Sequence, residues 1–308
     1  MGDCLNSIFA QQGESDFEII LIDDASTDNT ADVIHSYADP RIRVIRHEKN
    51  RGHVVTINEG LFAARGKFIT RIDPDDRYRP YFLKSTLEKF EAYPKVGFVY
   101  GDAAMINEEG QLTADSCDSI HGGKDFKGNE FLALLKKNFV CAPTGIARLE
   151  LWKKALPIPE GVSFSDWYLN LQMARRCEFY YVNRVVADYR VHPSNHHSKI
   201  VRDKSEEKTI LKLLNQIFRE REITETLERG KQKIRKSVYG AQYLKLADKY
   251  FGFRMDRDAR RCYLKALQFK PGHSLNPAMI RHLVATFMGH DLYERSKTFV
   301  RSLLEVRQ

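Results

Sequence analysis

Residues 67–76 read Lys67-Phe68-Ile69-Thr70-Arg71-Ile72-Asp73-Pro74-Asp75-Asp76. The first six of them alternate in the manner of a half-buried strand, and three carboxylates that bracket a proline follow directly. Carboxylates this close repel one another and lose solvation when buried, so a protein keeps them at a strand end mainly where a cation compensates their charge. The stretch therefore predicts a divalent metal site, and with it phosphate chemistry.

The spacing of the three acids assigns them different directions. Residues two apart in a strand face the same side, so Asp73 and Asp75 can converge on one point while Asp76 turns away. Oxygen ligands of this kind suit Mg²⁺ or Mn²⁺, which complete their coordination with water and substrate phosphate oxygens. The simpler alternative is that Asp75 and Asp76 only cap the turn before Pro80.

Length and composition describe an ordinary globular chain. Its 308 residues, 43% of them hydrophobic, suffice for one domain of usual size and a smaller one. The five cysteines lie far apart and form no Cys-x-x-Cys pair, which favours a reducing compartment. No apolar run approaches the roughly 18 residues of a membrane span, and no export signal is evident. We expect a soluble, cytoplasmic protein.

The net charge of +8 is unevenly distributed. Residues 1–200 carry 25 Lys/Arg and 28 Asp/Glu, a balance of −3, whereas residues 201–308 carry 24 and 13, a balance of +11. A basic region of this kind attracts anionic surfaces, although solvated helix faces account for the same composition. We expect peripheral membrane contact through this region and no nucleic-acid binding.

The chain changes character near residue 200. The first 200 residues alternate strand and helix signals, which predicts an α/β domain with a mostly parallel sheet flanked by helices. The expected strands are 17–22, 43–46, 67–72, 96–100, 179–182 and 185–190, and the expected helices are 28–37, 54–66, 80–90 and 129–137. A hairpin is expected at 105–112 and a linker at 194–205. Residues 201–308 are expected to form a basic, all-helical region.

A second acidic pair, Asp23 and Asp24, ends the strand at 17–22. Open α/β sheets bind ligands at the carboxyl ends of their strands, so one of these acids can accept hydrogen bonds from a base or a ribose. The signal is weak alone, because paired acids at a strand end also occur in receiver domains and as helix caps.

Several motifs in series resemble one known family. Residues 22–28 (Ile-Asp-Asp-Ala-Ser-Thr-Asp), then Asn50-Arg51-Gly52 with Asn58-Glu59-Gly60, then residues 66–76, resemble the family 2 glycosyltransferases of the GT-A fold. The match covers roughly residues 3–192. The resemblance implies an inverting, metal-dependent transferase that moves a sugar from a nucleoside-diphosphate sugar to a hydroxyl of a glycan, lipid or other acceptor.

The resemblance also implies roles for single residues. Asp24 would contact the base, Asp73 would lie near the ribose and the metal, and Asp75 would bind the metal, which is Mn²⁺ or Mg²⁺. Arg51 and Asn58 would help to hold the nucleotide.

Two further residues come from the later part of the matched region. Asp166 is similar to the catalytic acidic residue of the family, which lies at a helix start. There its carboxylate would act as a base and deprotonate the acceptor hydroxyl. His192 is similar to a histidine that reaches the metal or the diphosphate. Each also has a simpler structural interpretation: Asp166 as a helix N-cap, and His192 as a structural histidine after a strand.

The sequence departs from the family at its start. The usual first strand is absent, and residues 1–12 look like the helix that follows it. We expect that an upstream segment would raise stability and nucleotide affinity. The alternatives to a transferase are a sugar nucleotidyltransferase, a receiver-like module, and a degenerate GT-A protein that binds an anionic membrane or nucleic acid.

Overall fold

The computed structural model describes residues 1–13, 16–162, 164–192, 201–289 and 293. The chain divides into two compact units, Met1–Asn195 and His196–Gln308. The expected linker at 194–205 falls largely on residues 194–200, which lie outside the described residues. Each unit is described by itself below.

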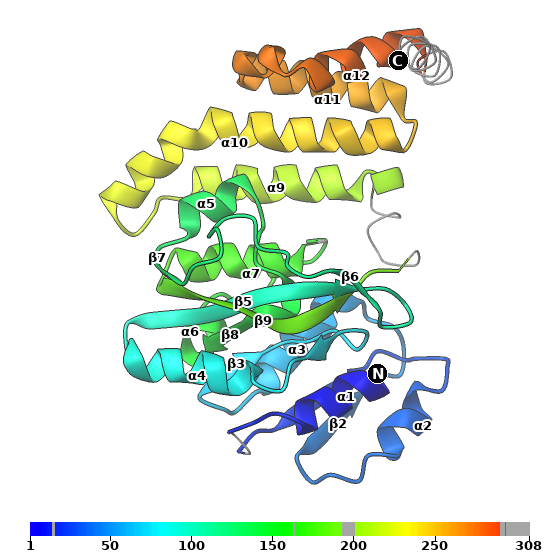
Figure 1. Cartoon of the computed structure of the whole chain (residues 1–308), viewed down its shortest axis with the longest axis vertical. Helices are drawn as coiled ribbons and strands as arrows, with labels where there is room; N and C mark the ends of the chain where they lie inside the picture. Colours follow the sequence, from blue (N-terminus) through cyan, green and yellow to red (C-terminus); the bar gives the residue numbers. More distant parts are fainter. Residues whose placement is uncertain (14–15, 163, 193–200, 290–292, 294–308) are drawn as a thin grey trace, which may run out of the picture. The chain divides into compact units, whose positions relative to one another are not determined.

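The first unit alternates helices and strands along the chain (Figure 1). Its helices are α1 (Gly2–Phe9), α2 (Thr30–His35), α3 (His53–Ala63), α4 (Phe82–Ala92), α5 (Phe131–Lys136), α6 (Leu149–Lys153) and α7 (Ser165–Ala174). Its strands are β1 (Ile19–Asp23), β2 (Ile42–Arg46), β3 (Phe68–Thr70), β4 (Arg77–Tyr78), β5 (Val96–Ile106), β6 (Leu112–Ala114), β7 (Phe126–Gly128), β8 (Gly145–Arg148) and β9 (Glu178–Arg190).

The strands form two sheets. The smaller consists of β1 and β2, which pair in parallel with Ile19 opposite Ile42 and Asp23 opposite Arg46. The larger has seven strands in the order β3-β8-β5-β9-β4, with β6 paired to β5 and β7 to β9. Helix α4 packs against β5 and β9, and α5 packs on α7, so helices flank the sheet (Figure 1).

The α/β class with flanking helices is confirmed, but strand direction is more mixed than expected. The β1–β2 and β5–β9 pairs are parallel, whereas β3–β8, β4–β9, β5–β6, β5–β8 and β7–β9 are antiparallel. Short returns explain part of this difference, because a tight turn joins only antiparallel strands. The β5–β6 hairpin shows it: Asn107 and Gln111 exchange hydrogen bonds across the expected turn.

The core of the first unit lies along β5 and β9. Buried aromatic rings from the two strands meet there, with the Phe98 and Phe179 ring centroids 4.6 Å apart. A Cβ atom on Gly145 of β8 would lie 2.4 Å from the Phe98 ring, so the close approach of β8 to β5 requires glycine.

The second unit is helical throughout its described residues, as expected. It contains α9 (Ser205–Arg219), α10 (Glu225–Gly252), α11 (Asp256–Phe269) and α12 (Pro277–Met288), with a 3₁₀ turn at Pro271–Leu275. The fully buried Lys231 donates to the carbonyl of Ile217 at 3.1 Å and pairs with Glu222 at 2.9 Å. This buried, paired charge ties the end of α9 to α10. In the described part of the chain, none of the helices combines the length and apolar character that crossing a bilayer requires.

We predict that Phe82→Ala lowers the free energy of unfolding by about 3–5 kcal/mol, because it removes a fully buried ring and leaves a cavity. That ring stacks on Tyr78 with centroids 4.3 Å apart. Urea unfolding followed by fluorescence measures the change. Phe62→Ala is the matched control, because Phe62 is exposed and its removal should shift the value by no more than about 0.5 kcal/mol. Equal losses in the two variants would contradict this description of the core.

Candidate functional site

The turn after β3 separates the three acids of residues 73–76. The amide of Asp76 donates to the carbonyl of Asp73 at 3.1 Å, which closes the turn. The Asp76 side chain is buried, and its Oδ1 accepts a hydrogen bond from the amide of Arg190 at 2.8 Å. Burial raises the pKa of Asp76 to about 7. Asp76 therefore fastens the turn to the end of β9.

Asp75 and His192 lie together at this turn. Nε2 of His192 is 3.2 Å from Oδ2 of Asp75, although 117 residues separate them in sequence. The side chains of Asp73 and Asp75 are both more than a third exposed, and Asp73 lies 3.8 Å from the guanidinium of Arg71. The turn thus offers a carboxylate and an imidazole side by side, with a second carboxylate near them.

These side chains fit a divalent cation that takes few protein ligands. Among the residues that the structure describes, no group of three or more His, Cys, Asp and Glu side chains is gathered as a closed metal site. Mg²⁺ and Mn²⁺ need fewer protein ligands, because water and phosphate oxygens complete their coordination. Asp75 and His192 therefore suit a cation that arrives with a phosphate-bearing ligand.

Asp24 holds the loop that leads into α3. Its Oδ1 accepts from the amide of Arg51 at 2.7 Å and its Oδ2 from the amide of Gly52 at 2.8 Å. Nδ1 of His47 lies 2.6 Å from Oδ1. Burial opposes ionisation of Asp24, but these hydrogen bonds prevail and lower the pKa of the carboxyl. Gly52 has φ +88°, a conformation that favours glycine, so the loop depends on both residues.

Arg51 and Asn58 extend the same region. Nη1 of Arg51 donates to Glu59 at 3.0 Å, and its side chain is partly exposed. Asn58 makes two hydrogen bonds with the backbone of Ile158: its Nδ2 donates at 3.0 Å and its Oδ1 accepts at 2.8 Å. Asn58 thus ties α3 to a segment 100 residues later, and its contact with a nucleotide stays a prediction.

Asp166 lies in the first turn of α7, as expected from the sequence. Its Oδ2 accepts a hydrogen bond from Nδ2 of Asn138 at 2.8 Å. Oδ1 of Asn138 in turn accepts from Asn170, one turn further along α7, at 3.4 Å. The helix N-terminus favours a negative charge at this position, and Asn138 fixes the orientation of the carboxylate.

Ser165 connects the parts of the site. Its Oγ accepts from Nη1 of Arg71 at 3.2 Å and lies 3.1 Å from Nε2 of His53. Arg71 leads back to Asp73, and His53 follows the loop that Asp24 holds. A chain of contacts thus joins the two acidic strand ends to the residue that precedes Asp166.

Sequence reasoning missed five of these residues: His47, His53, Arg71, Asn138 and Ser165. Arg71 alone carried a usable signal, because it shares a strand face with Asp73 and Asp75 by its spacing of two. The others act through partners that are distant in sequence.

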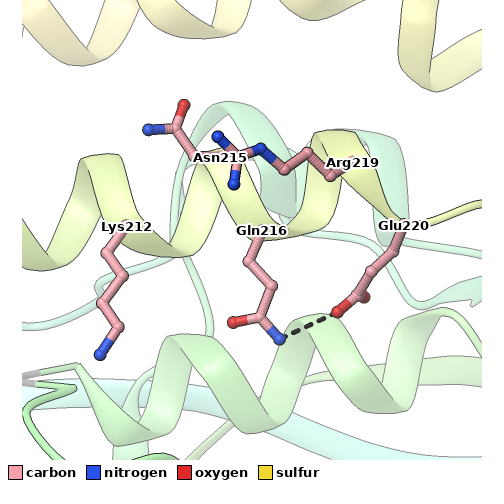
Figure 2. A pocket seen from close by; sticks show the side chains of 5 residues that line it. All are labelled: Lys212, Asn215, Gln216, Arg219 and Glu220. Carbon is pink, nitrogen blue, oxygen red and sulfur yellow. Dashed lines mark hydrogen bonds between the residues drawn. The ribbon is translucent and has the colours of Figure 1, made fainter.

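The second unit contains a pocket that includes none of the predicted site residues. It has a volume of about 450 Å³ and is lined by Lys212, Asn215, Gln216 and Arg219 of α9 and by Glu220, which directly follows that helix (Figure 2). Gln216 and Glu220, one turn apart, are hydrogen-bonded at 2.9 Å. This solvated helix face does not share the chemistry of the strand ends.

Comparison of the sequence with known proteins matches about two thirds of the chain at most. The sequence profile described as "Glycosyl transferase family 2" matches residues 1–149. An uncharacterized glycosyltransferase of Nostoc sp. is 30% identical over 218 residues, which are 66% of this chain and 64% of that protein. The succinoglycan biosynthesis protein ExoO of Rhizobium meliloti is 38% identical over 88 residues, 29% of this chain and 25% of that protein. The chain therefore spans less than two thirds of either relative.

Two solved structures share the fold at low sequence identity. Staphylococcus aureus TarS 1-349, crystallised with UDP, matches with a TM-score of 0.61 and 17% identity over 96% of this chain and 86% of that chain. The mannosyltransferase PcManGT of Pyrobaculum calidifontis, in complex with GDP-Man and Mn²⁺, matches with a TM-score of 0.56 and 16% identity over 92% of this chain and 81% of that chain.

The His47 contacts predict a pH-dependent stability. Its two ring nitrogens face carboxylates, Asp24 at 2.6 Å and Glu59 at 2.8 Å, and these bonds raise the pKa of His47. A raised pKa in the folded state gives stability that is complete below the unfolded value of about 6.5 and is lost as the pH rises through the folded value. The melting temperature of the wild type should therefore exceed that of His47→Gln most at pH 6, and the difference should shrink towards pH 9.

Thermal unfolding at half-unit pH steps measures this difference. His35→Gln is the control, because Nδ1 of the exposed His35 lies 2.6 Å from the backbone carbonyl of Ala31, a group that does not ionise. A difference between wild type and His47→Gln that stays constant over this range would exclude a charged His47 bridge.

Proposed function

Since the chain belongs to glycosyl transferase family 2 and has its GT-A fold, we propose that it transfers a sugar from a nucleoside-diphosphate sugar to an acceptor hydroxyl, with inversion and with a divalent metal. One observation carries the proposal. Asp75 and His192 adjoin at the end of β3, and the contacts of Arg71 with Asp73 and Ser165 connect that turn to the start of α7, where Asp166 lies.

The donor side of the proposal rests on the two strand ends. Asp75 and His192 would hold Mn²⁺ or Mg²⁺ against the diphosphate, and Asp73 would lie towards the ribose and the metal. Asp24 and Arg51 would form the base side, and Asn58 would support it from α3. The two structural neighbours, one in complex with UDP and the other with GDP-Man and Mn²⁺, support a ligand of this class.

The acceptor side rests on Asp166. Its carboxylate would take the proton of the acceptor hydroxyl as that oxygen attacks the anomeric carbon from the face opposite the diphosphate. When bound, the metal would neutralise the charge that develops on the leaving diphosphate. Attack from the opposite face inverts the anomeric configuration.

Asn138 would position this base. Its amide donates to Oδ2 of Asp166, which leaves Oδ1 to face the acceptor. The hydrogen bond also stabilises the ionised carboxylate, the form that a base must have.

The acceptor would be a glycan or lipid hydroxyl, as in the synthesis of cell-envelope polysaccharides. The basic second unit would hold the enzyme peripherally at a membrane, on the cytoplasmic side where nucleotide sugars are available.

We predict that two substitutions separate binding from transfer. Asp75→Ala should abolish Mn²⁺-dependent binding of the nucleotide sugar, because it removes the carboxylate beside His192. Asp166→Asn should retain that binding and lose about 10²- to 10⁴-fold in turnover, the range for removal of a positioned base.

A panel of UDP- and GDP-sugars with Mn²⁺ gives both readouts, with thermal shift for binding and release of the nucleoside diphosphate for turnover. Asp32→Asn, an exposed acid on α2, is the control and should change neither. Full turnover in Asp166→Asn, or unchanged metal-dependent binding in Asp75→Ala, would refute the assigned roles.

For Asn138→Ala we predict a lower kcat with an unchanged KM for the donor. Loss of the amide donor should leave the Asp166 carboxylate without a fixed orientation towards the acceptor hydroxyl, while the donor side of the site is untouched. Steady-state kinetics with varied donor concentration measures kcat and KM. A wild-type kcat, or a donor KM that rises as kcat falls, would exclude this positioning role for Asn138.

A further inference from the structure

The last described helix exposes apolar side chains. Val284, Phe287 and Met288 of α12 are 50%, 63% and 47% exposed, and their spacing of three and four residues places them on one face. The other side of α12 is already used, because Met279, Ala285 and Thr286 are buried within the unit. Apolar character on both sides is unusual for a surface helix and indicates a contact beyond the unit itself.

The apolar face continues onto α11. The guanidinium of Arg260 lies 3.9 Å from the centre of the Phe287 ring, and Arg260 also donates to the carbonyl of Thr286. Leu264, one turn further along α11 from Arg260, is 50% exposed. We call Leu264, Val284, Phe287 and Met288 together the α11/α12 apolar surface.

Basic side chains predominate on the two helices that carry this surface. Residues 259–289 include five Lys/Arg and no Asp or Glu. Arg261 is paired with Glu207, whereas Lys265, Lys270 and Arg281 are exposed. Basic side chains therefore dominate the rim of the surface, where the half-exposed Asp248 of α10 is the acidic neighbour of α12, 3.6 Å from Nδ1 of His282.

The combination of positive charge and exposed apolar side chains favours an anionic membrane over a protein as the partner of this surface. Protein interfaces are usually rimmed by mixed polar groups, whereas a leaflet of anionic lipids is uniformly negative and offers hydrocarbon beneath its headgroups. Val284, Phe287 and Met288 can enter the headgroup boundary, and long Lys and Arg side chains can reach the phosphates around them.

We propose that the α11/α12 apolar surface docks on an anionic phospholipid membrane. This surface would make the peripheral membrane contact proposed above for the transferase. The inference rests on the proposed function only for the expectation of that contact. The membrane would hold the second unit, and the transfer chemistry would remain in the first.

Sedimentation of the full-length chain with sucrose-loaded vesicles tests the proposal. Vesicles of phosphatidylcholine with about 30% phosphatidylglycerol should bind the chain, pure phosphatidylcholine vesicles should bind it weakly, and salt should weaken the anionic binding. Val284→Ser/Phe287→Ser should reduce binding by roughly tenfold or more, since two apolar side chains no longer enter the membrane. Lys265→Gln/Arg281→Gln should weaken binding and reduce its salt dependence.

Ile223→Ser is the matched control, because Ile223 is 74% exposed in the α9–α10 connection and lies outside the surface. It should bind as the wild type does, and circular dichroism should show equal helix content in all variants. Nucleotide-sugar turnover without vesicles should be unchanged in Val284→Ser/Phe287→Ser. That readout separates failure of membrane docking from failure of the transferase proposal.

Three results would overturn the proposal. The first is the absence of vesicle binding by the wild type, and the second is binding that Val284→Ser/Phe287→Ser leaves unchanged. The third is a dimer, seen by light scattering, that this double variant dissociates and that does not bind vesicles, because a second copy of the chain would then cover the surface. Retention of the wild-type chain by RNA but not by vesicles would also overturn the proposal.

Discussion

The parallel pairing of β5 with β9 is the constraint on which the first unit depends. Strands β8 and β6 pair with β5, β4 and β7 pair with β9, and β3 is attached through β8. The register shifts between Gly101 and Ala103, so the pair bends while it continues to Arg190. At that end the Arg190 amide holds Asp76, and His192, two residues further, meets Asp75. The position of the acidic turn thus follows from a strand pair that begins far from it.

The local sequence predicted the helices, strands and turns that form because of their own apolar pattern or turn residues. The apolar run before Asp23 gave β1, the periodic residues after Gly52 gave α3, and the turn at residues 107–110 gave the β5–β6 hairpin. The existence of β4, β7 and β8 was not predictable in this way. Those strands are two to four residues long, and pairing with β5 or β9, rather than their own propensity, makes them strands.

The residues of the candidate site show the same difference between local signals and long-range contacts. The sequence singles out Asp75, Asp166 and His192 because each lies at the start or the end of a recognisable element and carries a chemically distinctive side chain. Ser165, His53 and Asn138 were not found, because a serine, a histidine and an asparagine in isolation have many uses. Their roles come from contacts across 94 residues to Arg71, 112 residues between His53 and Ser165, and 28 residues from Asn138 to Asp166. Only the folded chain brings such partners together.

The separation of β1 and β2 from the larger sheet affects how the site behaves in time. Two paired strands are marginal by themselves, so this layer depends on α3 and on the polar contacts around Asp24 and His47. Local opening should therefore cost less free energy here than along β5 and β9, and backbone amides of β1 and β2 should exchange their protons sooner. A ligand that touches Asp24 would slow this exchange by binding only the closed layer. Binding of such a ligand would then be coupled to the ordering of this layer.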